Sequence, residues 1–539
     1  MAFFFDIIGG MEKPATDIYT FGELREKGYT YVDKTGMILP LVDNSIGKQF
    51  FIARPRRFGK SLLISTLQCL FEGRRELFEG LAIEPKWDWS KSWPVLHLDM
   101  GDCQSATVEG FWKKVRTVLK GESERLGVPL RADEEPCGQF RFLIDDLAAK
   151  SPEGQMVLLV DEYDKPLLGH LAKPDVTAFR DALKEFYSTI KTAEGKQRFT
   201  FITGVSKFSK VSIFSDLNNL KDRTMSPKEA TLLGYTHEEV RRTYPNMIRA
   251  LGEKFGVGED KAFEIIVAMY DGYKFEENAE RVINPVSLGF CLEQQKFGNY
   301  WAQTAVPTFL IDILKKEPLL MKSVDLPASA LDVYEPERPM IETLLYQTGY
   351  LTIRSTRVVG RDMTQTPPEL GQTVYELGFP NKEVADSFTE NLVPAYVGLG
   401  RIDANNLQRK AGEALLANDL PLFLKAMDGF FRSIPYSLTD RQNEQTWQAI
   451  VWTVLKGVGM FVRSEIQTAD GRIDMTVETP TDVYLIEFKL DDTAANAIRQ
   501  IREKRYAAPF ELSKKRITLI GLGFSSERRT IADRAYEPL

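Results

Sequence analysis

The chain has 539 residues, too many for one hydrophobic core, and its 43% hydrophobic and 27% charged residues exclude a disordered or fibrous protein. Its four cysteines form no CxxC pair and its three histidines are not spaced for metal binding, which argues against a disulfide framework, a zinc site and histidine-based triads. The net charge of −7 argues against a surface covered with basic residues for nucleic acid, although a local basic groove is compatible with it.

The chain offers no segment for a membrane. A spanning helix needs about 18 or more uninterrupted apolar residues, and no such window is present. The N-terminus, MAFFFDIIGG, lacks a basic leader and reaches Asp6 after a short apolar run, unlike a secretory signal. We therefore expect a cytoplasmic protein that has no membrane partner.

The first segment with chemical content is a predicted strand, KQFFIA, followed by the polar turn RPRRFGKS and an amphipathic helix. This order places a Gly-Lys-Ser motif at a helix N-terminus, where backbone N–H groups and the helix dipole bind phosphate. Gly59 lets the backbone approach phosphate, Lys60 reaches the β- and γ-phosphates, and Ser61 is a ligand for Mg²⁺. The segment therefore predicts an ATP-binding site.

The start of this loop departs from the common pattern, because Arg54 and Pro55 replace the first glycine. Proline holds φ near about −65°, so the turn begins differently while the phosphate cradle is retained. For Arg56 and Arg57 two alternatives stay open, a charge-assisted contact with phosphate or a solvent-facing side chain. The expected nucleotide-binding residues of the loop are Arg54, Arg57, Phe58, Gly59, Lys60, Ser61 and Leu62.

A second apolar run, MVLLVDEYDKPLL at 156–168, predicts a buried parallel strand that ends in Asp161 and Glu162. Carboxylates at the carboxyl end of such a strand lie at the ligand-binding edge of the sheet. We expect Asp161 to hold Mg²⁺ and Glu162 to orient the attacking water. The alternative is an acidic strand end that caps a helix, but two motifs in the right order favour ATP binding.

A third predicted strand, RFTFITGVSKFS at 198–209, brings Thr203 and Lys207 to the same edge. A hydroxyl in this position is able to sense the γ-phosphate, and a lysine is able to neutralise charge in the transition state. The alternative for Lys207 is an ordinary solvated lysine.

These segments resemble those of the AAA-ATPase-like proteins, a family abundant in bacteria, over about residues 15 to 300. The matching stretches are YVDKTGMI (31–38), RPRRFGKSLL (54–63), LLVDEYDKPL (158–167), TGVSKFSKVSIFSDLNNL (203–220) and LLGYTHEEV (232–240). In that family RPRRFGKS is the normal form of the loop. The resemblance therefore implies that Arg54 belongs to a family variant of the phosphate loop.

The middle of the chain is predicted to connect two functional parts. Residues 226–330 are expected to form a helical lid over the nucleotide. The helix and hairpin of MIETLLYQTGYLTIR and TVYELGFP predict a winged-helix-like module at 331–390. Few basic residues lie on its hairpin, which favours a packing spacer over a DNA-binding wing. Residues 391–434 are expected to be a helical linker.

The stretch GRIDMTVETPTDVYLIEFKL at 471–490 predicts two strands around a turn at 479–482. Antiparallel pairing about this turn places Asp474 opposite Glu487, and alternation places Lys489 on the same face. Two facing carboxylates repel unless a cation lies between them, and Mg²⁺ is such a cation. Lys489 then positions the attacking water or stabilises the phosphate in the transition state. The alternative is an exposed hairpin with ordinary surface charges.

The pattern of Asp474, Glu487 and Lys489 resembles the PD-(D/E)XK nuclease superfamily over about residues 435–535. The resemblance implies that Glu444, on a preceding helix, joins the metal site, and that Gln500, followed by Tyr506, belongs to an accessory motif. The helix of Gln500 also carries a basic surface suited to phosphate, formed by Arg499, Arg502, Lys504 and Arg505. Ile473 stands where the superfamily usually has proline.

The predicted fold class is α/β multidomain: a P-loop NTPase with a parallel sheet and flanking helices, a helical and winged-helix-like middle, and a C-terminal α/β restriction-endonuclease-like domain. The expected segments are 1–225 (ATPase core), 226–330 (lid), 331–390 (winged-helix-like module), 391–434 (linker) and 435–539 (nuclease-like domain).

The sequence thus predicts an ATPase coupled to an Mg²⁺-dependent nuclease, with ATP and Mg²⁺ as cofactors. Family analogy makes DNA a more probable partner than RNA, suggests a role in defence against foreign DNA or in mobile-element maintenance, and leaves a homo-oligomer open. Two alternatives are a signalling ATPase whose C-terminal domain binds nucleic acid or a protein without cutting, and a kinase.

Overall fold

The computed structural model describes residues 12–171, 173–208, 213–214, 217–301, 310, 324–332, 336–337, 340–361, 369–397, 401–432, 444–456, 461–468, 471–528 and 530–539. The chain forms two compact units. Unit 1 consists of Met1–Tyr300 and Asp325–Asn381, and unit 2 of Trp301–Val324 and Lys382–Leu539. Across these ranges, no helix combines the length and the apolar character that a membrane span needs. The finer division into five segments stays a prediction.

Unit 1 is built on a five-stranded parallel sheet with the strand order β2-β3-β4-β1-β5. Its strands are β1 (Gln49–Ala53), β2 (Val95–Asp99), β3 (Met156–Asp161), β4 (Gln197–Gly204) and β5 (Lys221–Asp222). Every residue of β1 and β3 is buried, which explains why these strands are continuous apolar runs and not alternating ones. Because all five strands are parallel, the carboxyl ends of β1, β3 and β4 meet at one edge. The predicted parallel sheet is confirmed.

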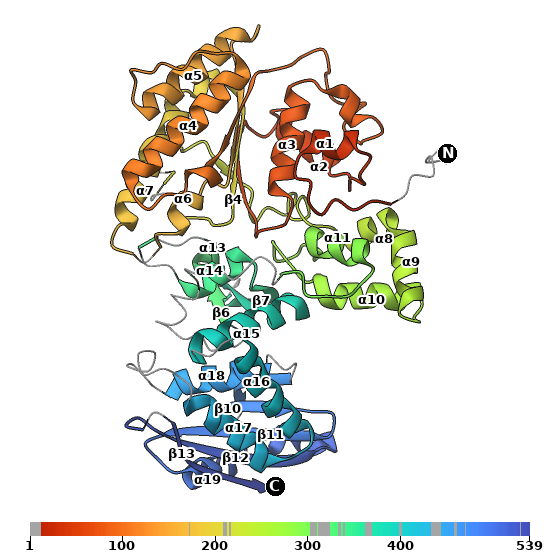
Figure 1. Cartoon of the computed structure of the whole chain (residues 1–539), viewed down its shortest axis with the longest axis vertical. Helices are drawn as coiled ribbons and strands as arrows, with labels where there is room; N and C mark the ends of the chain where they lie inside the picture. Colours follow the sequence, from red (N-terminus) through yellow and green to blue (C-terminus); the bar gives the residue numbers. More distant parts are fainter. Residues whose placement is uncertain are drawn as a thin grey trace. The chain divides into compact units, whose positions relative to one another are not determined.

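Helices cover both faces of this sheet, with α1 to α3 on one side of β4 and α4, α5 and α7 on the other (Figure 1). Their bounds are α1 (Phe21–Glu26), α2 (Thr35–Val42), α3 (Lys60–Phe71), α4 (Val108–Leu126), α5 (Pro136–Lys150), α6 (Lys165–Leu168) and α7 (Val176–Thr192). In α3, the buried residues Leu63, Ile64 and Leu67 recur at helical spacing. This apolar stripe holds the helix of the phosphate loop on the sheet.

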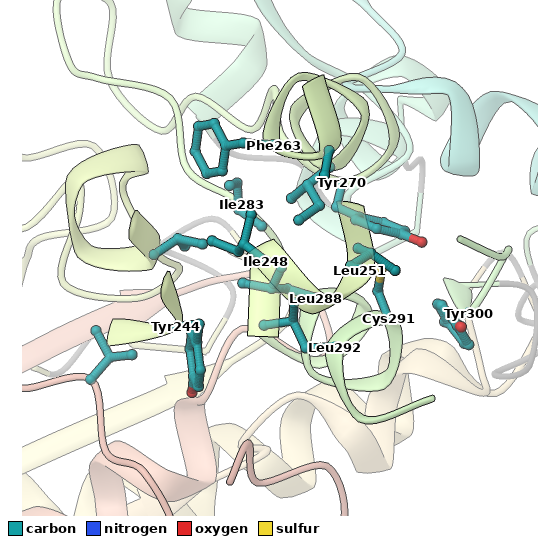
Figure 2. Packing of buried hydrophobic residues seen from close by; sticks show 14 residues of the cluster. Tyr244, Ile248, Leu251, Phe263, Tyr270, Ile283, Leu288, Cys291, Leu292 and Tyr300 are labelled. Carbon is teal, nitrogen blue, oxygen red and sulfur yellow. The ribbon is translucent and has the colours of Figure 1, made fainter. Parts of the chain in front are cut away.

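A helical subdomain follows, made of α8 (His237–Thr243), α9 (Pro245–Lys254), α10 (Glu259–Tyr270) and α11 (Pro285–Gln294). Thr236 and Glu239 form a capping box at the start of α8. The four helices enclose a core of their own, in which Ile248, Leu251 and Tyr270 lie among the labelled side chains of Figure 2. The prediction of a mainly helical stretch is thereby confirmed for the described residues from 237 to 294.

The winged-helix-like module contains β6 (Val324–Pro327), α13 (Ala328–Asp332), α14 (Ile341–Thr348), β7 (Thr352–Val359) and β8 (Gln372–Gly378). Its sheet has the order β6-β8-β7, and β7 and β8 form the predicted antiparallel hairpin, whose connection at 362–368 lies outside the described residues. The module packs within unit 1, since the backbone N–H of Lys274 donates to Thr352 Oγ1 at 2.8 Å. The role of the module as a spacer stays a prediction.

Unit 2 is a five-stranded mixed sheet with the order β13-β12-β11-β10-β9, in which only β11 and β12 pair in parallel. Its strands are β9 (Phe461–Thr468), β10 (Gly471–Glu478), β11 (Asp482–Leu490), β12 (Arg516–Ser525) and β13 (Thr530–Pro538). Its helices are α15 (Lys382–Val397), α16 (Arg401–Leu416), α17 (Leu420–Arg432), α18 (Glu444–Lys456) and α19 (Ala494–Glu503). The mixed C-terminal α/β fold agrees with the predicted fold class.

Alternating residues of β11 face two different layers. Val483 and Leu485 pack in one core with Ile498 and Ile501 of α19. On the other side, the Tyr484 hydroxyl donates to Leu415 O at 2.7 Å, at the end of α16. The ring of Trp447 from α18 stacks on Phe524 of β12, with centroids 4.7 Å apart. The helices that precede the sheet therefore contribute to the core of unit 2.

We expect the substitution Tyr484→Phe to destabilise unit 2 by about 0.5–1.5 kcal/mol, the usual net contribution of one buried hydrogen bond. The ring stays packed while Leu415 O and Asn418 Oδ1 lose their donor. Denaturant unfolding measures the change. An unchanged stability would show that α16 is not held to the sheet by this contact.

Candidate active sites

The phosphate loop connects β1 to α3 in a tight turn. Gly59, which caps α3, has φ of 88°, and Arg57 has φ of 68°, so both adopt the left-handed conformation that glycine tolerates best. The buried Lys60 ammonium donates to Arg54 O at 3.0 Å and to Pro55 O at 2.9 Å. Ser61 is exposed in the first turn of the helix. Two carbonyl groups of the loop thus accept the hydrogen bonds of the loop's own lysine.

Carboxylates at and just after the end of β3 act on the charge of this lysine. Burial lowers the pKa of Lys60, while the charges of Asp161, Asp164 and Glu162 raise it. Arg56 also lowers the pKa of Lys60, which indicates that its cationic group lies within electrostatic range of the phosphate loop. The structure therefore brings together Lys60, Asp161 and Glu162, the three residues that the sequence predicts to share an ATP site.

The Asp161–Glu162 step has an unusual backbone. Asp161 is the last residue of β3 and is buried, and its Oδ1 accepts the Glu162 N–H at 2.8 Å. Glu162 has φ of 46°, a conformation that costs free energy for a residue with a side chain. Its Oε2 lies 3.1 Å from Lys165 Nζ. The strained turn directs two adjacent carboxyl groups to the carboxyl end of the strand.

Two further carboxylates at this edge were missed by the sequence interpretation. Asp99 ends β2 and pairs in register with Asp161. Burial raises its pKa, and the charges of Asp161 and Glu162 raise it further. Asp164 is buried, and it accepts the N–H groups of Ser206 at 2.6 Å and Val205 at 3.2 Å. The sequence signal for Asp99 was available, because VLHLD is also an apolar run that ends in an acid.

The predicted residues of the third strand have partners inside the protein. The Thr203 hydroxyl donates to Ile52 O at 2.7 Å, between β4 and β1. Lys207 forms an ion pair with Asp222 of β5, and its backbone N–H donates to Gln347 Oε1 of α14 at 2.8 Å. The roles in sensing or stabilising the γ-phosphate stay predictions.

Arg54 is buried and donates to three backbone carbonyl groups: Ala53 O at 2.9 Å, Thr224 O at 2.7 Å and Glu229 O at 3.1 Å. Its guanidinium also lies 4.3 Å from the ring centroid of Phe275. Burial lowers its pKa to about 10, which leaves it charged at neutral pH. These contacts give Arg54 a structural function that the sequence interpretation did not consider.

The other loop residues also have described surroundings. Phe58 is buried, whereas Leu62 is partly exposed in the first turn of α3. Arg57 Nη1 donates to Tyr300 O at 3.1 Å. This partner was neither of the two alternatives considered for Arg57 from the sequence. A nucleotide-binding role for these three residues stays a prediction.

In unit 2, the hairpin register is the predicted one. Met475 pairs with Ile486 and Glu478 with Val483, around the turn at 479–482. In the same register, Asp474 falls opposite Glu487, and its backbone N–H donates to Glu487 Oε2 at 3.3 Å. Asp474 Oδ2 accepts the Phe488 N–H at 2.8 Å. Both residues are buried: Asp474 is 6% exposed to solvent and Glu487 is 1% exposed. This burial excludes the exposed-hairpin alternative.

Two side chains contact the Glu487 carboxyl group, and a third contacts one of them. Lys489 Nζ lies 3.5 Å from Glu487 Oε1, and the Gln500 amide on α19 donates to the same oxygen. Gln500 Nε2 in turn lies 3.5 Å from the Tyr506 hydroxyl. Packing of α19 on the sheet thus brings four residues of the predicted motif to one point.

The charge on this site is unfavourable in the isolated protein. Burial raises the pKa of Glu487 to about 8, and the Asp474 charge raises it as well, while Lys489 lowers it. Each of these two causes would be relieved by a cation bound between the carboxylates. The chemistry of the donor set therefore fits Mg²⁺, which needs only one or two protein carboxylates beside water and phosphate.

Larger ligand groups are not found in the described part of the chain, where no three His, Cys, Asp or Glu side chains are arranged to hold a metal. Glu444 begins α18, but its side chain lies outside the described residues. Its predicted contribution to the metal site therefore stays a prediction.

Comparisons with known proteins agree with both predicted domains. Residues 15–214 match the protein family described as predicted AAA-ATPase, and residues 442–534 match the PD-(D/E)XK nuclease superfamily. The chain is also 35% identical over 537 residues to a protein of Azotobacter chroococcum mcd 1 described as an uncharacterized protein in the vnfD 5' region. That similarity covers 97% of this chain and 98% of the relative.

We expect Arg54→Gly, which restores the more common first residue of a phosphate loop, to destabilise unit 1 by about 3 kcal/mol or more. The substitution leaves buried carbonyl groups without their donor, each at a cost of about 1–3 kcal/mol. Chemical denaturation of the purified variant measures the loss. If the variant kept wild-type stability and bound ATP more weakly, the result would contradict this expectation and would indicate that Arg54 contacts the nucleotide.

For Glu487→Gln we expect a pH-dependent gain in stability in the absence of metal. The folded pKa of Glu487 is raised above its unfolded value, so the folded state holds the extra proton between the two pKa values and wild-type stability falls as pH rises through this window. The Tm of the wild type should therefore drop relative to the variant between about pH 5 and pH 9, by roughly 2–4 °C per kcal/mol.

Calorimetry in a chelating buffer measures this difference. Adding Mg²⁺ at the alkaline end should raise the Tm of the wild type and leave that of the variant nearly unchanged. Parallel Tm curves across the whole pH range would contradict a strained carboxylate pair.

Proposed function

From the premise that the chain belongs to the AAA-ATPase-like proteins with a C-terminal PD-(D/E)XK nuclease superfamily domain, we propose that it is an ATP-regulated, Mg²⁺-dependent nuclease that cleaves DNA. The two domains assign an ATPase activity and a metal-dependent nuclease activity to the chain. The choice of DNA, the identity of the metal and the coupling between the activities are the proposal.

The observation that carries the nuclease proposal is the buried pair of Asp474 and Glu487. Burial and the charge of Asp474 raise the pKa of Glu487, which destabilises the fold unless the site has a use for the charge. Lys489 adds a single positive charge on the same face. A carboxylate pair with an adjacent cation is the donor set that phosphodiester hydrolysis requires.

When bound, Mg²⁺ lowers the pKa of a water and neutralises charge on the phosphate. Asp474 and Glu487 are the residues that would hold it. The amide of Gln500 orients the Glu487 carboxylate, and the Tyr506 hydroxyl lies beside that amide, so both act as positioning residues. Lys489 is the group that would hold the attacking water or stabilise negative charge on the phosphate.

At the other site, the phosphate loop is suited to ATP. Phosphate oxygens would accept the Lys60 hydrogen bonds that Arg54 O and Pro55 O accept in the structure. Asp161 would hold Mg²⁺ with Ser61, and Glu162 would orient water. The predicted nucleotide contacts of Thr203 and Lys207 are part of this proposal.

Basic residues beside the second site support a nucleic-acid substrate. Arg499, Arg502, Lys504 and Arg505 are exposed on or just after α19, and Arg502 is paired with Glu537 at 2.6 Å. Exposed cations near the carboxylate pair are suited to phosphate contacts. The preference for DNA rests on family analogy, as do the expected cytoplasmic location and a role in defence against foreign DNA or in mobile-element maintenance. Loss of phage protection in a deletion strain would support the defence role.

The test is cleavage of supercoiled DNA by the purified chain with Mg²⁺, in the presence and absence of ATP. Asp474→Asn should lower the cleavage rate at least about 100-fold, the usual effect of removing one group that stabilises transition-state charge. The matched control is Glu478→Gln, a carboxylate on the same strand that is paired with Lys515. This variant should cleave like the wild type.

A Lys60→Ala variant tests the ATP dependence in the same assay. We expect it to lose ATP hydrolysis and the response of cleavage to ATP, while cleavage without ATP is retained. Equal cleavage by wild type and Asp474→Asn would contradict the nuclease assignment, and RNA as the better substrate would contradict the choice of DNA. Wild-type cleavage that is identical with and without ATP would contradict the coupling.

A further inference from the structure

Three side chains of the phosphate loop point away from the phosphate cradle and into the surrounding protein. Arg54 donates to the carbonyl groups described above, Arg57 donates to Tyr300 O, and Phe58 is buried. The loop that binds phosphate is therefore also a packing element. The contacts of Arg57 and Phe58 lead toward the places where the chain leaves unit 1.

Arg57 connects the loop to the core of the helical subdomain. Its Nη1 lies 3.1 Å from Tyr300 O. The Tyr300 ring is buried in the cluster shown in Figure 2, and its hydroxyl donates to Lys296 O at 2.7 Å. Tyr300 is thus held from two sides, by a helical core through its side chain and by the phosphate loop through its carbonyl group.

Phe58 connects the loop to the segment at 271–276. Its ring meets Tyr273 edge-on, with centroids 4.7 Å apart, and Phe275 at 5.3 Å. Phe275 also lies under the Arg54 guanidinium. The phosphate loop is therefore packed against aromatic side chains of this segment.

The same segment holds the end of the winged-helix-like module. Asn381 is buried, and its Nδ2 donates to Asp271 O at 2.7 Å. Gly272 has φ of 105°, and a Cβ atom at this position would lie 2.0 Å from Pro380 O. Only glycine allows this approach, so residues 380 and 381 are tightly held against the segment.

Tyr300 and Asn381 are the last residues of unit 1 at two of the points where the chain passes to unit 2. The two segments that continue into unit 2 are joined by a hydrogen bond there. The Trp301 N–H donates to Glu383 Oε1 at 2.8 Å. Glu383 is fully buried in the first turn of α15. Both connections therefore lead to the beginning of the same helix.

We propose that Arg57, Phe58 and Asn381 are positioning residues that transmit nucleotide binding at the phosphate loop to α15, and through it regulate the nuclease unit. The proposal deepens the proposed function and rests on its ATP site. Phosphate that takes over the hydrogen bonds of Lys60 changes the loop, and the loop holds both Tyr300 and, through 271–276, Asn381. Nucleotide then favours one arrangement of the start of α15 over another.

The test is hydrogen–deuterium exchange of the full chain, with and without saturating adenylyl-imidodiphosphate. In the wild type we expect the nucleotide to change exchange of the amides at 382–397 by about 5-fold or more, the lower end of usual coupling between sites. In Asn381→Ala the change should disappear, while the Kd for the nucleotide, measured by calorimetry, stays the same. This readout does not require nuclease activity.

The matched control is Asn278→Ala. Asn278 is exposed in the same stretch of chain, and its side-chain nitrogen makes a long contact, at 3.5 Å, with Glu276 Oε1. It should respond to nucleotide like the wild type. Should Asn381→Ala fail to fold, two other variants replace it. Arg57→Met should reduce the exchange response at saturating nucleotide, and Asn381→Ser, which keeps a donor, should retain part of that response.

The outcomes separate the coupling from the proposed function. Nucleotide that binds the wild type without changing exchange at 382–397 overturns the coupling and leaves the ATP site intact, as does an unchanged response in Asn381→Ala. A coupled response in a chain that cleaves no nucleic acid supports the coupling and contradicts the nuclease. Failure of the wild type to bind the nucleotide overturns the ATP site and the coupling together.

Discussion

The buried guanidinium of Arg54 is the interaction on which the nucleotide site depends. It occupies the position of the usual first glycine and joins the end of β1 to the backbone at Thr224 and Glu229 through three carbonyl groups. A buried charge is expensive unless its hydrogen bonds are made, so this arrangement specifies one conformation of the loop. Lys60, the lysine predicted to bind phosphate, donates to the carbonyl group of Arg54 itself and is therefore part of the same network.

In unit 2, the buried charges are compensated less completely. Here two carboxyl groups of like charge, Asp474 and Glu487, are buried together, and the structure compensates them only in part through Lys489 and Gln500. In the proposed function, a bound cation would relieve the remaining strain. Unit 1 thus contains a buried charge whose hydrogen bonds go to backbone carbonyl groups, and unit 2 contains buried carboxyl groups that Lys489 and Gln500 compensate only in part.

Several features could be predicted because they depend on neighbours in sequence. Continuous apolar runs that end in an acid predicted β3, and hairpin alternation with a short turn predicted the register that brings Asp474 and Glu487 together. Other features depend on segments far apart in the chain. Asp99 meets Asp161 because of strand order, Arg57 meets Tyr300, and Gln347 bonds the backbone of Lys207. No local pattern encodes these pairs.

The sequence by itself identified the residues to which the proposed function assigns the chemistry, because a glycine–lysine–serine turn before a helix and an acid–acid–lysine hairpin use local backbone geometry. The tertiary structure alone decided the contacts of the residues around them. Arg54 looks like a phosphate ligand in sequence, yet two of its three carbonyl partners, Thr224 and Glu229, lie 170 and 175 residues away along the chain. The helices at 401–432 look like a linker, yet they pack on the nuclease sheet. The physical reason is that burial and long-range hydrogen bonds depend on which segments fold against each other, and local patterns do not contain this information.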